Sequence, residues 1–86
     1  MNIYDWNEIV KHNHENDCWI VANGYVYNVT DFIKNHPAGS KSIINKAGTD
    51  CTIDFDFHSK KAQINIWKPY RIGKLKGYKF YSCTIM

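Results

Sequence analysis

Two histidines, His36 and His58, are the residues of this chain whose type and setting could do chemistry. Each is expected on a turn between short apolar helices. The segment between them supplies apolar side chains that include Ile43, Ile44, Phe55 and Phe57. Neutral imidazole nitrogen is an axial ligand of haem iron, and the flat macrocycle needs apolar walls on both faces. Two imidazoles would fill both axial positions, which suits the iron to passing single electrons rather than to binding dioxygen or substrate.

The three cysteines lie more than thirty residues apart and include no C-x-x-C pair. Their odd number and wide spacing give no sign of a disulfide framework. The C-x-x-C-H motif that attaches haem covalently is also missing, so a haem would be held by ligation and packing alone. No signal peptide and no run of 18 apolar residues is present, so we expect a cytoplasmic protein in a reducing compartment.

The size and charge of the chain limit its possible functions. With 86 residues, 44% of them hydrophobic, it can build one domain with one core. Residues 1–58 carry eight acids and four lysines, whereas residues 59–86 carry seven bases and no acid. This asymmetry suggests an anionic partner or surface, although most such runs are only solvated faces. Nucleic acid is the less favoured partner, because a haem domain already accounts for the ordered pattern of residues.

A β-hairpin is the clearest element among those that must position the histidines. Asn-Gly at 23–24 joins the β-prone runs 18–22 and 25–29, and both central residues of a type I′ turn need positive φ. Before the hairpin, an acidic cap at Asp5 and helical spacing predict a helix over about 6–12. Near the end of the chain, alternating residues predict short strands at 70–75 and 78–81.

A series of short helices is predicted after the hairpin. Thr30 can cap a helix that must stop near His36, because Pro37 pushes the preceding residue out of α geometry. Three more helices are indicated by their capping residues: Ser40, Asp50 and Ser59. The last is expected over about 60–67. This order of elements is typical of an α+β fold, in which a small sheet closes one side and paired helices stand on the other.

Many residues between about positions 4 and 76 occur in the order that one known family shows. They are Trp19, Asn23-Gly24, Val26-Tyr27, Val29-Thr30, Phe32, His36-Pro37-Ala38-Gly39, Ala47-Gly48, Asp50, Phe55, His58-Ser59, Ala62 and Tyr70-Arg71-Ile72-Gly73-Lys74-Leu75. Together they resemble cytochrome b5. The resemblance implies a small single α+β domain, whose short mixed sheet and paired short helices form a haem pocket. We place this domain at residues 1–78, with a short basic and aromatic tail at 79–86.

The resemblance also implies which residues hold the cofactor, haem b. The axial ligands of the family correspond to His36 and His58, and Ser59 corresponds to the residue that meets a haem propionate. The other expected pocket residues are Ile20, Val29, Phe32, Ile43, Phe55, Ala62 and Ile66.

Three departures from the family pattern stand near this site. The usual His-Pro-Gly-Gly turn has alanine in its third position, at Ala38. The segment between Phe55 and His58 is shorter than usual by a couple of residues. Lys41 and Lys46 stand where the family often carries acids that dock basic partners, so the usual electrostatic partner is the least transferable expectation.

The resemblance implies an electron carrier and not an enzyme. Such a protein takes single electrons from a flavoprotein reductase and passes them to a haem or non-haem iron acceptor, such as an oxidase, desaturase or hydroxylase. We expect it to be a monomer. The alternative is a haem-binding regulatory or storage module that undergoes no redox cycling.

A second metal site is a weaker alternative reading of the N-terminal region. His12 and His14, with Cys18 nearby, could form a zinc cluster, but the surrounding acids and polar turn favour exposed histidines. Trp19, Trp67 and Tyr27 are expected to pack in the core or on the surface rather than to form a cofactor box.

The last four residues, Cys83 to Met86, fit a C-a-a-X box of the farnesyl type. A single lipid chain needs a polybasic second signal for stable membrane binding, and seven bases precede this cysteine from residue 59 onward. We expect no transmembrane anchor, so lipid-mediated peripheral contact through Cys83 is a hypothesis. A chance tail is its alternative.

Overall fold

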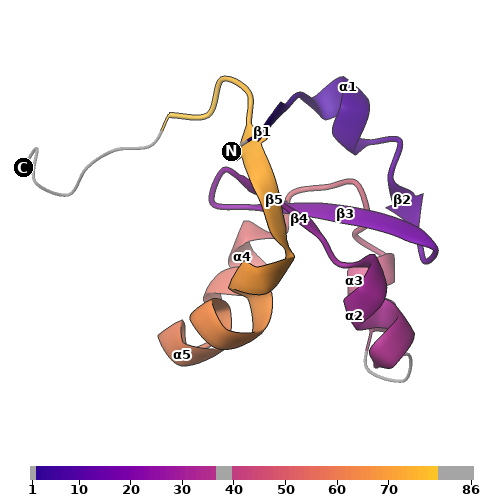
Figure 1. The fold of residues 1–86 in the computed structure, drawn as a ribbon, viewed down its shortest axis with the longest axis vertical. Coiled ribbons are helices and arrows are strands. Elements are labelled where there is room, and N and C mark those ends of the chain that lie inside the picture. Colours follow the sequence, from indigo (N-terminus) through magenta and orange to yellow (C-terminus); the bar gives the residue numbers. More distant parts are fainter. Residues whose placement is uncertain (1, 37–39, 80–86) are drawn as a thin grey trace, which may run out of the picture.

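A five-stranded sheet lies at the centre of the computed structural model, which describes residues 2–36 and 40–79 (Figure 1). Its strands are β1 (Asn2–Tyr4), β2 (Asn13–His14), β3 (Asp17–Ala22), β4 (Tyr25–Asn28) and β5 (Arg71–Leu75). Their order in the sheet is β1-β5-β4-β3-β2. Strands β1 and β5 run parallel, and the other neighbours are antiparallel. This mixed sheet with short helices confirms the predicted α+β fold class.

Strands β3 and β4 form the hairpin that the Asn-Gly pair predicts. Asn23 has φ 52° and Gly24 has φ 80°, the two positive values that a type I′ turn requires. The register pairs Val21 with Val26. The strand predicted at 70–75 is also present as β5, whereas Tyr78 and Lys79 are not in a strand, and residues 80–86, including Cys83, lie outside the described part.

The two edge strands at the N-terminal side were not predicted. Strand β1 approaches β5 so closely that a Cβ on Gly73 would lie 2.5 Å from the carbonyl oxygen of Asn2. Strand β2, which sequence patterns assigned to a turn, pairs with β3 through Asn13 and His14. Strands of two or three residues carry no readable alternation, so their pairing depends on the neighbouring strand.

The helices of the structure are short. They are α1 (Trp6–Ile9), α2 (Thr30–Asn35), α3 (Lys41–Ile44), α4 (Thr52–Asp56) and α5 (Lys60–Ala62), followed by the π-helix η2 (Gln63–Trp67) and the 3-10 helix η3 (Lys68–Tyr70). Helix α1 ends sooner than predicted, with Val10 as its C-cap. Figure 1 shows α2 and α3 on one side below the sheet, and α4 and α5 on the other.

Two of the predicted N-caps, Asp5 and Ser59, are correct. The other three either stand one position from the observed N-cap or make no side-chain capping hydrogen bond. The Asp5 carboxylate accepts a hydrogen bond from the Glu8 N–H, and the Ser59 hydroxyl accepts one from the Ala62 N–H. Thr30 is the first residue of α2 instead of its cap. Ser40 precedes α3, but its side chain makes no capping bond. Cys51 is the N-cap of α4, although the Asp50 carboxylate accepts from the Thr52 N–H at 2.8 Å.

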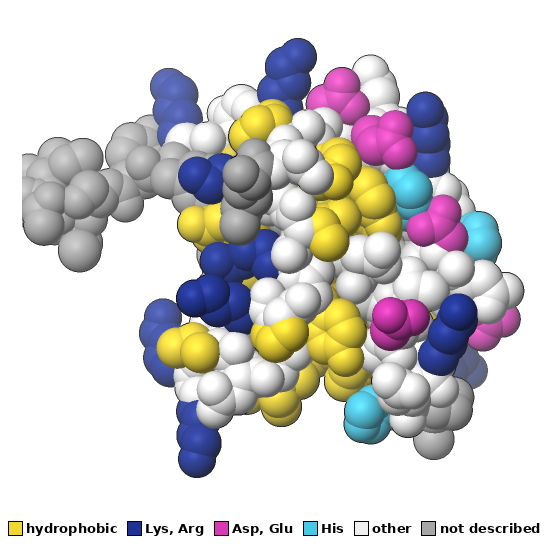
Figure 2. All heavy atoms as spheres, viewed as in Figure 1, with side chains coloured by type: hydrophobic (Ala, Val, Ile, Leu, Met, Phe, Trp, Pro, Cys, Tyr) yellow, Lys and Arg dark blue, Asp and Glu magenta, His cyan; other side chains and the backbone are white. Residues whose placement is uncertain are grey.

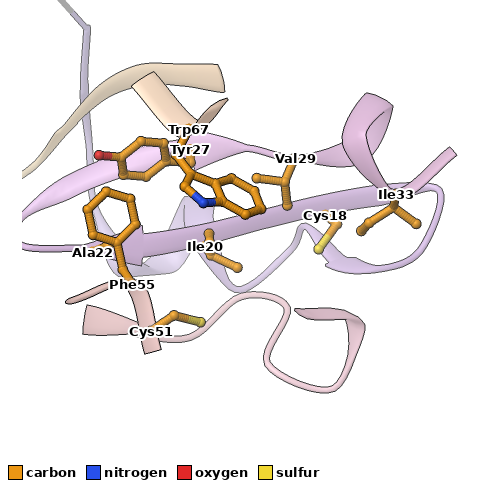
Figure 3. Close-up of a cluster of buried hydrophobic side chains, with 9 residues drawn as sticks. All are labelled: Cys18, Ile20, Ala22, Tyr27, Val29, Ile33, Cys51, Phe55 and Trp67. Atoms are coloured by element: carbon orange, nitrogen blue, oxygen red, sulfur yellow. The ribbon is translucent and has the colours of Figure 1, made fainter. Parts of the chain in front are cut away.

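Both faces of β3 are buried, because successive side chains of a strand point to opposite sides. The face toward the helices forms one core cluster (Figure 3): Cys18, Ile20, Ala22, Tyr27, Val29, Ile33, Cys51, Phe55 and Trp67. The opposite face forms a second cluster of Ile9, Trp19, Val21 and Val26, which α1 helps to cover. The sheet therefore separates a helix-covered core from a smaller one near the N-terminus.

The charge asymmetry of the sequence becomes a spatial asymmetry in the fold. The bases from Lys60 to Lys79 lie on α5, η3, β5 and the residues that follow β5. In Figure 2, most of the visible Lys and Arg side chains gather on the left, whereas the Asp and Glu side chains gather on the right. No helix within residues 2–36 and 40–79 is long and apolar enough to cross a bilayer.

His12 joins α1 to the sheet, contrary to the expectation that it is exposed. Its ring nitrogens lie 2.8 Å from a Glu8 carboxylate oxygen and 2.7 Å from an Asp17 carboxylate oxygen. The ring also stacks on Trp19, with 3.6 Å between centroids and 7° between planes. Burial lowers the pKa of His12, but the bonds to the two carboxylates outweigh this effect and raise the pKa above 6.5. His12 therefore connects Glu8 of α1 to Asp17 of β3, and we call this set of contacts the His12 clamp.

We expect this clamp to make stability depend on pH. A raised folded-state pKa means that the stabilisation by protonated His12 is full below about pH 6.5 and is lost as pH rises through that pKa. Replacing His12 by Gln should therefore cost roughly 1 kcal/mol more at about pH 6 than at about pH 9, since both carboxylates are partly solvated. Urea unfolding at the two pH values measures this difference. The exposed His14→Gln variant is the control, and an equal cost of H12Q at both pH values would contradict the clamp.

Candidate functional site

A cavity of about 390 Å³ opens on the helix-covered face of the sheet, between the α2–α3 side and the α4–η2 side. Its lining residues are Ile20, Phe32, Ser42, Ile43, Lys46, Cys51, Asp54, Phe55, His58 and Trp67. Most of the exposed lining is apolar, and the volume lies within the range of roughly 300–1,000 Å³ that is usual for cofactor sites. The cavity is therefore suited to an apolar ligand, and His58 brings an imidazole nitrogen to its lining.

The rear wall of the cavity is fixed by backbone hydrogen bonds to β3. The N–H of Val21 donates to the Thr49 carbonyl at 3.0 Å, and the N–H of Cys51 donates to the Val21 carbonyl at 2.6 Å. These bonds hold residues 49–51 beside the strand and place the start of α4. Phe55 consequently reaches the core, where its ring centroid lies 5.4 Å from that of Tyr27.

His58 stands two residues after the end of α4, at the rim of the cavity. Its N–H donates to the Phe55 carbonyl at 3.0 Å, so the histidine continues the last turn of that helix. Ser59 then begins α5 as its N-cap. The imidazole is exposed, and its ring centroid lies 5.5 Å from that of Trp67.

His36 is the C-cap of α2, which agrees with the helix end predicted near this residue. Its N–H donates to the Phe32 carbonyl at 2.9 Å, and its ring stacks on the Phe32 ring with 4.6 Å between centroids. Nδ1 lies 3.4 Å from the same carbonyl oxygen. A ring nitrogen held near a carbonyl leaves Nε2 as the metal-binding atom. The Pro-Ala-Gly turn at 37–39 lies outside the described residues.

Aromatic contacts connect the two histidines through the base of the site. Phe32 stacks on His36 and lies 4.6 Å from Trp67, and Trp67 in turn lies 5.5 Å from His58. Phe32 belongs to α2 and Trp67 to η2, so this contact joins the two sides of the cavity. Each histidine therefore contacts one member of the Phe32–Trp67 pair.

The structure brings together some of the other predicted pocket residues and not the rest. Ile20, Phe32, Ile43 and Phe55 line the cavity with His58. The remaining predicted residues do not line it: Val29 is fully buried in the core, Ala62 is half-buried, Ser59 is exposed and Ile66 is 47% exposed. His36 is also not a lining residue and reaches the site through Phe32.

Trp67 occupies the place expected for Ile66, and the π-helix explains the shift. On an α-helix Ile66, four residues after Ala62, would share its face, whereas the i→i+5 bonding of a π-helix gives that place to Trp67. Trp67 is only 6% exposed. The large apolar indole was a signal for a buried position, but no local pattern indicates the extra residue in the turn.

Three polar lining residues were also missed: Ser42, Lys46 and Asp54. The ammonium of Lys46 forms an ion pair with the Asp54 carboxylate, and this bond raises the pKa of Lys46. Lys46 stands where the family often has a docking acid, and here its charge is balanced within the domain. The polar pair marks one edge of an otherwise apolar cavity.

The buried thiols act as small apolar side chains. Burial raises the pKa of Cys18 to about 11 and also raises the pKa of Cys51, so both stay protonated near neutral pH. A protonated, buried thiol is a poor nucleophile and a poor metal ligand. Within residues 2–36 and 40–79, no three His, Cys, Asp or Glu side chains converge on a metal site.

Comparisons with known proteins show which family the chain resembles in sequence and in fold. Residues 5–76 match the family model described as "Cytochrome b5-like Heme/Steroid binding domain". The chain is 49% identical over 75 residues to "Nitrate reductase [NADH]" of Cucurbita maxima, and 50% identical over 74 residues to that of Spinacia oleracea. These alignments cover 86% and 85% of this chain but 8% of each relative. The chain thus spans a small part of the length of the reductases it matches.

Two solved structures share the fold. "Cytochrome b5 of Ostreococcus tauri virus 2" superposes with a TM-score of 0.72 at 38% identity, over 84% of this chain and 94% of that one. Cytochrome b558 of Ectothiorhodospira vacuolata, described as a prokaryotic homologue of cytochrome b5, gives a TM-score of 0.76 at 25% identity, over 87% and 99%. Both likenesses cover nearly the whole of the compared chains.

We expect substitutions at 66 and 67 to reveal the π-helical register. Trp67→Leu removes buried aromatic surface and should lower the free energy of unfolding by about 2 kcal/mol. Ile66→Ala removes a half-exposed side chain and should cost less than about 1 kcal/mol. Urea denaturation of the two variants gives the comparison. An α-helical register would reverse the order of the two effects.

Proposed function

Because this chain belongs to the cytochrome b5 family of haem-binding domains, we propose that it carries single electrons on a b-type haem held between His36 and His58. The observation that carries this proposal is the set of ring contacts that ties both histidines to the walls of one apolar cavity. Bound haem supplies an iron centre that gains and loses one electron.

The residues of the chain would hold the cofactor from several sides. Ile20, Phe32 and Phe55 supply apolar walls that exclude water from the macrocycle. The two imidazoles would each supply a nitrogen to the iron, which would leave no binding position for a substrate. The oxygen of Ser59 accepts from the Ala62 N–H, which leaves its own O–H proton available to a propionate.

Partners follow as part of the proposal. The donor we propose is a flavoprotein reductase that uses NADH, because the relatives are named as NADH-dependent nitrate reductases. The acceptor is a haem or non-haem iron enzyme, and the domain itself turns over no substrate. The basic side on α5 and β5 favours an acidic face on one of these partners.

The ligand assignment predicts the spectra of histidine variants. His36→Ala and His58→Ala should each abolish the six-coordinate low-spin spectrum of the haem-loaded protein, because each variant lacks one of the two imidazoles that would bind the iron. Visible absorption spectroscopy of the purified variants measures this loss. His14→Ala changes an exposed histidine elsewhere and should keep the wild-type spectrum. Retention of that spectrum by either of the first two variants would overturn the ligation.

Carbon monoxide separates electron transfer from the alternative, a haem-binding regulatory or storage module. A closed site with two imidazoles should leave the reduced spectrum unchanged when the gas is added. A module with an exchangeable ligand should bind the gas and shift the spectrum. Reduced wild-type protein, recorded with and without carbon monoxide, gives the answer, and a shift would favour the alternative.

A further inference from the structure

Gln63, the first residue of η2, is bonded to the segment that carries His58. Its Nε2 lies 2.8 Å from the carbonyl oxygen of His58 and 3.4 Å from that of Phe55. Both partners are acceptors, so the amino end of the carboxamide must face them. The bond to His58 has ordinary length, and the bond to Phe55 is long. Gln63 thus attaches the end of α4 to the helix that follows.

This attachment adds to the backbone bond that already ties His58 to α4, from its N–H to the Phe55 carbonyl. Only Phe57 separates α4 from His58, and the side chain of Phe57 is 85% exposed. The imidazole of His58 is exposed, and its ring contact is with Trp67. A hydrogen bond at the carbonyl of a residue restricts its backbone, and the backbone determines where the ring begins.

Gln63 and Trp67 hold His58 from the same π-helix. Gln63 binds the carbonyl group, while Trp67 packs beside the ring. The two residues are the first and last of η2, which is anchored by Ser59 at the start of α5. Single-turn π-helices occur frequently at functional sites, and here the turn presents both contacts to one histidine.

We propose that Gln63 is a positioning residue for the iron ligand His58. Its carboxamide would hold the backbone from which the imidazole extends, and would thereby help to orient the ring toward the haem and slow release of the cofactor. This proposal rests on the ligand role of His58 stated above. Partners of the ring nitrogen of a metal-bound histidine typically change metal affinity by about 10–100-fold when they are removed, and a bond to the backbone carbonyl acts less directly.

Two variants remove the donor in different ways. Gln63→Met keeps the length of the side chain without a polar hydrogen, and Gln63→Glu keeps its shape but replaces the amide donor by a carboxylate. Gln63→Lys restores N–H donors at a similar reach. Asn65→Leu is the matched control, because it changes an exposed amide on the same helix.

The measurements are made on the haem-loaded full chain. Transfer of haem to an excess of apomyoglobin gives the release rate, and electron paramagnetic resonance of the ferric protein gives the g-anisotropy, which depends on the angle between the imidazole planes. Because this bond is to the backbone, Gln63→Met and Gln63→Glu should each release haem several-fold faster, up to about tenfold, with altered g-anisotropy. Gln63→Lys should return both values toward those of the wild type.

The outcomes separate this inference from the proposed function. If the Met and Glu variants match Asn65→Leu in both release rate and g-anisotropy, the positioning role is wrong. A change in release rate with unaltered g-anisotropy would indicate general loosening of the fold and would also overturn it. If the wild type gives no low-spin signal, or keeps it in His58→Ala, the ligation itself fails.

Discussion

The contact between Phe32 and Trp67 is the interaction on which the site depends. It joins α2 to η2 at 4.6 Å between ring centroids, so each side of the cavity supports the other. Helices α2 to α5 have three to six residues each, too few to be stable alone. Their position therefore comes from packing against the sheet. Rings that pack on one another at the base leave the cavity open toward its rim, where His58 stands.

The second face of the sheet is closed by different means. Helix α1 covers a small cluster around Ile9 and Trp19, and the His12 clamp ties it to β3 through a carboxylate at each end. This division leaves the larger helix-covered face available for a cofactor. Because both faces of β3 are buried, packing holds this strand on two sides at the base of the site. A bound apolar macrocycle would add to the buried surface of a domain this small.

Local signals in the sequence predicted much of this arrangement. The Asn-Gly turn predicted the hairpin, and Ser59 predicted the start of α5, because each acts through a few neighbouring atoms. Features that depend on distant partners were missed. The His12 clamp requires Trp19 to stack against its ring. Strand β1 requires a residue without a Cβ beside it, which is Gly73. The π-turn places Trp67 where an α-helix would place Ile66. There Trp67 packs against Phe32 and His58, which are contacts that helical periodicity cannot predict.

The central claim is that one haem lies in the cavity with its iron between the two histidines. A crystal structure of the haem-loaded protein tests it most directly. The account predicts iron bonded to Nε2 of both His36 and His58, with the macrocycle between Phe32 and Phe55 and the Gln63 carboxamide still bonded to the carbonyl of His58. Iron bonded to only one of these histidines, or a haem bound outside the cavity, would contradict it.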